Sequence, residues 1–179
     1  MKSVFDKFGL LFSVACVILL FDQWTKWLVR STLPFGSSWM PESLNWLSPY
    51  ARIVHWHNTG AAFGMFQNGS MIFTVLAFIV IGAIIYYFPQ VEKTDWTLRL
   101  AMSMQMGGAF GNLTDRILRE GRVTDFISVG TFPVFNVADA SISVGTVILL
   151  LGVYLQERTA KWEQESLNSS NQTGETTSE

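Results

Sequence analysis

The sequence predicts an all-α integral membrane protein with four transmembrane helices and a small β-sheet outside the membrane. Of its 179 residues 49% are apolar and only 15% are charged, whereas an ordinary soluble domain has about 25% charged residues. The apolar residues gather in four stretches that can cross a bilayer. The connection between the first two stretches contains a run of β-branched and aromatic residues, which favours a strand.

The four spans are predicted at about residues 8–29, 69–88, 96–118 and 137–156. A helix needs about 20 residues to cross the hydrocarbon layer. The second stretch reaches this length without a charged residue. The first does so only if it includes Asp22 and Lys26, which lie four residues apart and can therefore form an ion pair on one helix face.

The segments between the spans complete a single membrane domain over residues 1–165. Residues 31–68 are too long for a simple turn and contain the strand-like run 52–57, so they are predicted to form a small extracytoplasmic sheet. Residues 119–136 are predicted to be a second extracytoplasmic segment, and a loop or short helix is expected over the site. Residues 166–179 lack enough apolar side chains to fold, and a disordered polar tail is predicted there.

Four crossings place both termini on the same side of the membrane. The twelve lysines and arginines divide evenly between the two sides. Lys26 and Arg116 stand beside aspartates, and without these two the positive-inside rule leans towards cytoplasmic termini. A net charge of −2 and the lack of a basic stripe argue against a nucleic-acid partner.

Four aspartates are predicted to gather at one end of the helices. Span 1 ends where span 3 ends and where span 4 begins, so Asp22, Asp115, Asp125 and Asp139 lie towards the same face. A carboxylate inside a membrane costs at least a few kcal/mol and indicates a functional site.

Asn112 shares one face at the end of span 3 with Asp115 and Arg116, because it precedes them by three and four residues. Glycines at positions 107, 108 and 111 allow a neighbouring helix to approach closely. The structural alternative is a helix-packing seam that ends in an Asp115–Arg116 ion pair.

Asp125 and Asp139 are the strongest catalytic candidates. Asp125 lies among apolar residues, where desolvation would raise its pKa, although an exposed loop or helix cap would also suit an aspartate. Asn136 and Asp139 fit a helix cap and its first turn, yet their apolar neighbours place them at hydrocarbon level. Two facing carboxyl groups do not both ionise readily, so one can take a proton from water while the other gives one away.

Other catalytic chemistries lack their motifs. His55 and His57 have no HExxH context and no clear third ligand, so neither a metal nor another cofactor is expected. Asn58 and Gly60 are predicted to lie in a turn. The functional alternative is that this turn presents the Asn58 amide to a peptide.

Taken together, these motifs resemble the lipoprotein signal peptidases, the type II signal peptidases of bacteria. The resemblance is carried, in the family's order, by D-Q-W-T-K at 22–26, N-T-G-A-A-F at 58–63, G-G-A-F-G-N-L-T-D-R at 107–116, V-T-D-F at 123–126 and F-N-V-A-D at 135–139. The resemblance implies an aspartic endopeptidase that cleaves prolipoproteins before a diacylglyceryl-modified cysteine.

Carried over residue by residue, the resemblance makes Asp125 and Asp139 the catalytic pair. It implies that the substrate-binding and supporting residues are Asn58, Gly60, Asn112, Asp115, Arg116, Asn136, Ala138, Asp22 and Lys26. It further implies a monomer in the bacterial inner membrane, with cytoplasmic termini, a β-cradle, an active site near the extracytoplasmic face, contact with membrane lipid and sensitivity to globomycin. The stretch between Asp125 and Asp139 is shorter than the family leads one to expect.

Two alternatives from other classes remain open on the residues alone. A proton-coupled carrier could use the aspartates as a relay, but they gather near one face instead of crossing the midplane. A non-catalytic assembly factor could bind lipidated peptides in the same groove.

Overall fold

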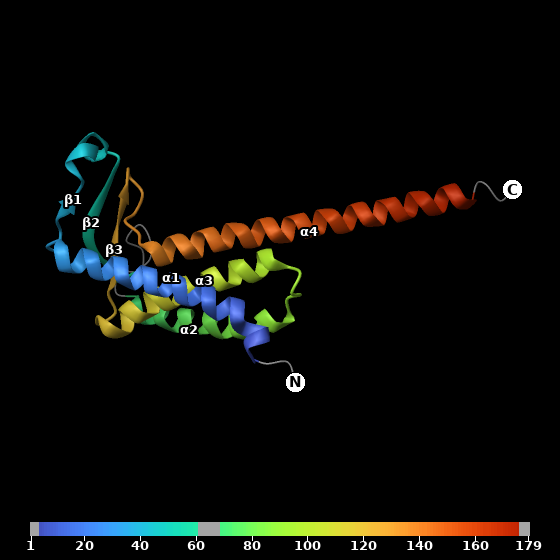
Figure 1. The fold of residues 1–179 in the computed structure, drawn as a ribbon, viewed down its shortest axis with the longest axis horizontal. Helices are drawn as coiled ribbons and strands as arrows, with labels where there is room; N and C mark the ends of the chain where they lie inside the picture. The colour runs from blue at the N-terminus through green and yellow to red at the C-terminus, as the bar shows by residue number, and fades with distance from the viewer. Residues whose placement is uncertain (1–3, 61–68, 176–179) are drawn as a thin grey trace.

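Four helices lie side by side, and a three-stranded sheet stands at one end of them (Figure 1). The computed structural model describes residues 4–60 and 69–175, so the Ala61–Phe63 part of the N-T-G-A-A-F motif lies outside the described residues. The helices are α1 Val4–Thr32, α2 Ser70–Tyr87, α3 Trp96–Leu118 and α4 Val137–Glu175. Two short 3-10 helices, η1 Glu42–Leu47 and η3 Phe88–Gln90, lie in the connections.

Three of the described helices are long and apolar enough to cross a membrane. They cover Lys7–Thr32, Ser70–Gln90 and Val137–Thr159, in agreement with the first, second and fourth predicted spans. Large apolar side chains such as Val17, Ile72 and Leu150 are exposed on their outer surfaces. An exposed apolar surface of this kind suits a lipid environment, and the chain is a multi-pass membrane protein.

The third predicted span has the predicted bounds but a different character. α3 contacts α1, α2 and α4, and its buried residues include polar ones such as Ser103, Asn112 and Asp115. A helix surrounded by other helices can carry these polar groups because its neighbours, rather than lipid, satisfy them.

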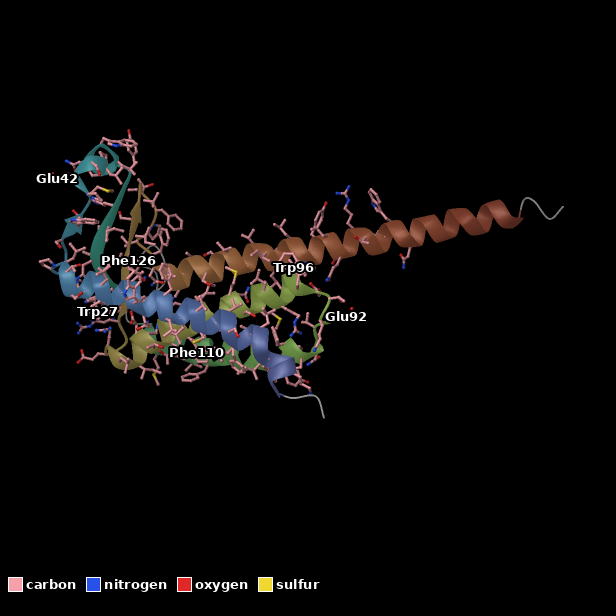
Figure 2. All side chains as sticks on the ribbon, in the orientation of Figure 1. Trp27, Glu42, Glu92, Trp96, Phe110 and Phe126 are labelled. Carbon is pink, nitrogen blue, oxygen red and sulfur yellow. The ribbon has the colours of Figure 1, made fainter. Side chains whose placement is uncertain are left out.

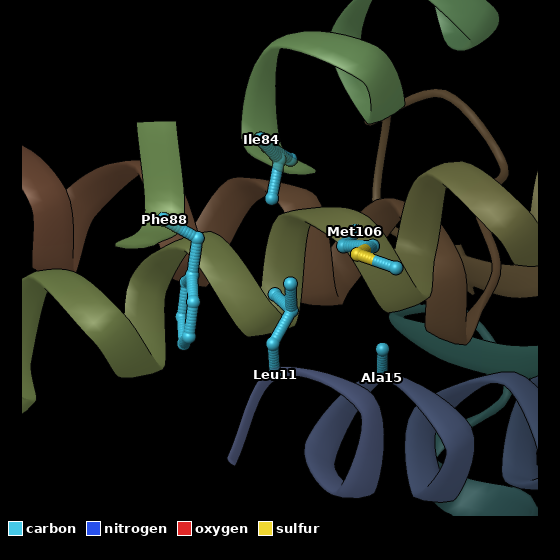
Figure 3. Close-up of a cluster of buried hydrophobic side chains, with 5 residues drawn as sticks. All are labelled: Leu11, Ala15, Ile84, Phe88 and Met106. Atoms are coloured by element: carbon cyan, nitrogen blue, oxygen red, sulfur yellow. The ribbon is translucent and has the colours of Figure 1, made fainter. Parts of the chain in front are cut away.

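The apolar core joins the first three helices. Leu11 and Ala15 of α1, Ile84 of α2, Phe88 of η3 and Met106 of α3 form a buried cluster, and their side chains converge between the helices (Figure 3).

Arg99 closes the core at the end opposite the sheet, where Figure 2 labels Glu92 and Trp96. Its guanidinium lies 4.2 Å from the centre of the Phe88 ring and donates to the carbonyls of Val91 and Lys7. This arrangement ties α3 to α1 and to the turn after η3.

Glycines bring α3 into close contact with α4 and α1 beneath the sheet. A Cβ at Gly108 would lie 2.5 Å from the Ala138 carbonyl oxygen and 2.7 Å from Cγ1 of Ile142. A Cβ at Gly111 would lie 2.6 Å from Oδ2 of Asp22. Small residues let the helix backbones approach, as predicted.

The sheet has the order β1-β2-β3, with β1 Ser38–Trp39, β2 Ala51–Asn58 and β3 Val123–Val129 all antiparallel. The first two strands confirm the sheet predicted in residues 31–68. The segment that carries Asp125 was not predicted to be a strand, and it forms β3. The alternative of an exposed loop or helix cap for Asp125 is therefore wrong. The β-branched residues of β3 suit a strand, but only pairing with β2, whose Trp56 lies opposite Asp125, provides the hydrogen bonds.

The C-terminal part also differs from the prediction of a fourth span ending near 156 and a disordered tail at 166–179. In the structure α4 continues to Glu175, beyond the end of the bundle (Figure 1). Residues 157–165 are rich in Glu, Gln, Lys and Arg, which are good helix formers. A scarcity of apolar side chains argues against a buried core in this segment, but it does not forbid a helical backbone.

Replacing Gly108 with Ala is expected to destabilise the bundle. The new methyl group would overlap the α4 backbone, and overpacking of this kind costs about 1–3 kcal/mol. Thermal unfolding in detergent, followed by the fluorescence of the seven tryptophans, should show a lower midpoint. Gly82→Ala is the matched control, because nothing lies within 4 Å of its Cβ position. Equal midpoints for the two variants would show that the contact is not tight.

Candidate active site

A hairpin brings Asp125 and Asp139 to the same place. Phe135 returns alongside β3, where its carbonyl accepts from the Ile127 N–H at 2.8 Å and its own N–H donates to the Ile127 carbonyl at 3.1 Å. The chain then enters α4 within two residues. The short stretch between the aspartates is therefore just long enough for one strand, a turn and a return.

Asn136 and Asp139 cap the N-terminus of α4 reciprocally. The Asp139 N–H donates to Oδ1 of Asn136 at 2.9 Å, and the Asn136 N–H donates to Oδ2 of Asp139 at 3.2 Å. This is the capping-box arrangement. The helix-cap interpretation of these residues is confirmed, and the cap fixes both side chains.

Two amide side chains connect the carboxylates. Nδ2 of Asn136 donates to Oδ1 of Asp125 at 2.7 Å and to Oδ1 of Asn112 at 3.1 Å. Nδ2 of Asn112 donates to Oδ1 of Asp139 at 2.7 Å. Each aspartate thus accepts a hydrogen bond from an amide, and the two amides contact each other.

Lys26 orients these amides from below. Its Nζ lies 3.0 Å from Oδ1 of Asn112, and a lysine ammonium can only donate. The oxygen of Asn112 must therefore face Lys26 and its NH₂ group must face Asp139. Lys26 is fully buried, so no water replaces this donor.

Asp22 and Asp115 neutralise Lys26. Its Nζ lies 2.9 Å from Oδ2 of Asp22, which confirms the predicted pair, and 3.5 Å from Oδ2 of Asp115. Asp22 also accepts the Ala138 N–H at 2.9 Å, and Asp115 accepts the Thr124 N–H at 2.9 Å. The cluster therefore joins α1, α3, β3 and the start of α4.

Arg116 does not form the ion pair with Asp115 that the sequence allowed. Among the described residues Asp115 lies near Arg30 and Arg119, both at 3.6 Å, whereas the Arg116 guanidinium lies 5.5 Å from the centre of the Phe73 ring. Adjacent residues of a helix point in different directions. Arg116 faces the cavity that also contains the aspartates.

Asp125 is buried, with 2% of its surface exposed. Its pKa is raised from 3.8 to about 7, chiefly because burial penalises the charged carboxylate and secondly because Asp139 is negative. Hydrogen bonds from Asn136 and Asn58 oppose the shift. Asn58 also accepts the Gly60 N–H at 2.9 Å, so the predicted turn forms and presents this side chain to Asp125.

The site opens into a cavity of about 720 Å³ between α2 and α4. α3 forms its floor, since α3 contacts both helices while α2 and α4 barely meet. At the sheet end the cavity is lined by Asn58, Gly60, Asn112, Arg116, Asp125 and Asp139. Further from the sheet its walls are mostly apolar, with Leu76 and Val80 from α2 among them.

The predicted site residues divide into two groups in the structure. The residues just named line the cavity, together with Asn136 behind them, whereas Asp22, Lys26, Asp115 and Ala138 form the support beneath. Three supporting side chains were missed: Gln23, Arg30 and Thr124. Gln23 donates to the Gly111 carbonyl and to Asp22, and Arg30 donates to the Thr124 hydroxyl. Arg30 could have been found, because it lies one helical turn beyond Lys26.

Comparison with known proteins gives a consistent result. A sequence model of the family described as signal peptidase (SPase) II matches residues 14–155. The lipoprotein signal peptidase of Halalkalibacterium halodurans is 40% identical over 157 residues, which cover 86% of this chain and 97% of that protein. That of Symbiobacterium thermophilum is 40% identical over 149 residues, 81% and 94% of the two chains. A solved bacterial membrane enzyme superposes with a TM-score of 0.73 at 29% identity, covering 86% of this chain and 91% of its own.

Replacing Lys26 with Met is expected to destabilise the protein strongly. The change would leave Asp22 and Asp115 buried without their shared cation, and breaking a buried ion pair costs about 3–5 kcal/mol. The thermal midpoint in detergent should fall well below that of Lys7→Met, a control at an exposed lysine of the same helix. The double variant Asp22→Asn/Lys26→Met should recover part of the loss. A midpoint for Lys26→Met equal to that of the control would contradict the account.

The raised pKa of Asp125 predicts that this group lowers stability as the pH rises. The folded state keeps its proton up to about pH 7, whereas the unfolded state loses it near pH 4. Unfolding therefore releases a proton between these values, and stability falls across that window. Asp125→Asn should melt roughly 5 °C above the parent at pH 8 and at the parent's temperature at pH 4. Glu120→Gln, at an exposed carboxylate, should show no such pH-dependent difference.

Proposed function

The chain belongs to the signal peptidase II family, and we propose that Asp125 and Asp139 are the catalytic pair with which it removes signal peptides. Its relatives are named lipoprotein signal peptidases. The activity is accordingly that of an aspartic endopeptidase acting on prolipoproteins. The alternatives of a proton-coupled carrier and of a non-catalytic assembly factor find no support among these relatives.

One observation carries the assignment of the pair: both carboxylates line the same cavity and are joined by two amide side chains. Asp125 has a pKa of about 7, so it can hold a proton near neutral pH. Both oxygens of Asp139 accept N–H donors. We assign Asp125 as the carboxyl group that starts protonated and Asp139 as the carboxylate that accepts a proton from water.

The proposed reaction needs no metal and no covalent intermediate. Asp139 removes a proton from a water molecule as its oxygen attacks the scissile carbonyl, and Asp125 donates its proton to the carbonyl oxygen. The tetrahedral intermediate then collapses: the C–N bond breaks and the leaving amine takes the proton from Asp139. One hydroxyl of the intermediate returns its proton to Asp125 as the C=O bond re-forms, which restores both carboxyl groups. The products are a signal peptide with a free carboxylate and a lipoprotein whose cysteine has a free amino group.

The groove between α2 and α4 suits the approach of a substrate from the membrane. Its apolar walls fit the hydrophobic part of a signal peptide, and its polar end contains the pair. Asn58 and Arg116 are positioned to contact the peptide backbone at the cleavage site. We propose that the bond cleaved lies immediately before a cysteine that carries a diacylglyceryl group, and that globomycin-type inhibitors and membrane lipid enter the same groove.

We further propose that α3 completes a fourth crossing of the bacterial inner membrane. α3 has 23 residues, or about 34 Å of helix, which is sufficient for the hydrocarbon layer. The start of α1 and the end of α4 then lie in the cytoplasm. The sheet and the catalytic pair lie near the extracytoplasmic face. The protein is proposed to work as a monomer, because every residue of the site comes from one chain.

Asp125→Asn and Asp139→Asn are each expected to reduce cleavage by at least about a thousandfold, since each removes one half of the proton transfer. Cleavage of a synthetic diacylglyceryl-cysteine lipopeptide by the purified protein measures this directly. Both variants should still unfold in a single cooperative transition in detergent, and Glu120→Gln should cleave normally. Substantial turnover by either asparagine variant would refute the assignment.

A further inference from the structure

A second polar contact between α3 and α4 lies in the groove, away from the catalytic pair. Nε2 of Gln105 donates to Oγ1 of Thr146 at 3.3 Å, and the Thr146 hydroxyl donates to the Ile142 carbonyl at 2.8 Å. Gln105 is half-buried, Thr146 is exposed and both line the cavity. Among the described residues, Thr146 is the one hydrogen-bond partner of the Gln105 carboxamide.

The Gln105–Thr146 contact joins α3 to α4 in the same way as the Asn112–Asp139 contact does, but two helical turns further from the sheet. Gln105 precedes Asn112 by seven residues and Thr146 follows Asp139 by seven, so each lies on the same helix face as its counterpart. At 1.5 Å per residue the displacement is about 10 Å along both helices. The Gln105–Thr146 contact thus stands directly below the Asn112–Asp139 contact, on the side away from the sheet.

Holding the two helices together does not require this hydrogen bond. Gly108 and Gly145 already bring the backbones together, since a Cβ at Gly145 would lie 3.0 Å from the Ala101 carbonyl oxygen. The Cγ of Gln105 lies 3.2 Å from that same Cβ position. The aliphatic part of Gln105 therefore covers the glycine, and its carboxamide extends to the cavity side of the interface.

A polar side chain in this position suits a polar occupant. Away from the sheet end the groove lining is apolar apart from Gln105, Thr146 and Ser143, and unsatisfied hydrogen-bonding groups that face lipid are costly. An acyl chain would leave Oε1 and the second Nε2 hydrogen of the carboxamide without a partner. An extended peptide would satisfy it, because Oε1 can accept a backbone N–H and Nε2 can donate to a backbone carbonyl, as the edge of a strand does.

We propose that Gln105 and Thr146 form a subsite that binds the backbone of the signal peptide upstream of the scissile bond. An extended chain advances about 3.3 Å per residue, so a displacement of about 10 Å corresponds to the third residue before the cleaved bond. The proposal rests on the proposed function, because that function places the scissile bond at Asp125 and Asp139.

The signal-peptide backbone just upstream of the scissile bond needs a hydrogen-bonding partner inside the membrane. A signal peptide can satisfy its own backbone groups inside the membrane only while it remains helical. It must become extended to bring its scissile bond between the two carboxylates. The residues between the end of its helix and the cleavage site then have unpaired N–H and C=O groups, and Gln105 with Thr146 can satisfy those of one residue.

Binding and cleavage of lipopeptides that carry a single N-methyl group test the subsite. The methyl group removes one backbone donor, and it is placed in turn at the second to fifth residue before the cleaved bond. In the parent enzyme, N-methylation at the third residue should lower kcat/KM about tenfold more than at the fifth. Gln105→Leu should raise KM for the unmodified lipopeptide about tenfold with kcat within twofold, and should abolish the extra penalty at the third residue.

Three matched variants separate recognition from packing. Thr146→Val should reproduce part of the effect, whereas Thr146→Ser, which retains the hydroxyl, should not. Gln90→Leu places the same substitution at the opposite end of the bundle, where Gln90 donates to the Tyr86 carbonyl, and it should leave KM unchanged. If Gln105→Leu does not fold, the two Thr146 variants still test the proposal.

Two results would overturn the inference. One is an N-methyl penalty that is the same in Gln105→Leu and in the parent enzyme. The other is that the KM of Gln105→Leu depends on the length of the substrate's acyl chains and not on N-methylation of its peptide. That result would make the groove a lipid site. Measuring binding of the same lipopeptides to Asp125→Asn, which needs no turnover, distinguishes a failure of the subsite from a failure of the proposed catalytic pair.

Discussion

The site depends on one buried ammonium group. Lys26 contacts Asp22, Asp115 and the amide oxygen of Asn112 within 3.5 Å, and it has no access to water. A buried charge is tolerable only when it is paired and fully hydrogen-bonded, so the helices that supply its partners must keep their places. Through Asp22 the constraint extends to the first turn of α4, and through Asp115 to β3. The stability of the bundle and the geometry of the site therefore both depend on this single residue.

The same constraint decides which way the amides face. Asn112 could present either end of its carboxamide to Asp139, but a lysine donor below it leaves only one arrangement without a clash of donors. The NH₂ group of Asn112 then faces the Asp139 carboxylate. In the same way the NH₂ group of Asn136 faces Asp125. Pre-organisation of this kind matters for catalysis, because donors that are already oriented need not reorganise during the reaction.

In the proposed mechanism, the burial of Asp125, which would ordinarily be a cost, is what makes this carboxyl group a proton donor. Asp125 lies on a strand at the end of the bundle with 2% of its surface exposed, and its raised pKa lets it hold a proton where an exposed aspartate would not. Phe126 beside it lies where the sheet meets the helices (Figure 2). The sheet thus acts as a support that carries one carboxyl group to the edge of the membrane region, while α4 carries the other.

The helices, their lipid-facing character and the residues proposed for the site could all be predicted from the amino-acid sequence. Apolar length defines a span, and a costly aspartate in an apolar setting indicates function, so both are local properties that can be read from a single chain. The Asp22–Lys26 pair and the cap at Asn136 are equally local. Three features became visible only in the folded chain. Residues 123–129 pair with β2, Asp115 lies near Lys26 and Arg30 instead of Arg116, and the groove lies between α2 and α4. These features depend on contacts between segments far apart in sequence, and the energy of such a contact cannot be assigned until both partners have been placed.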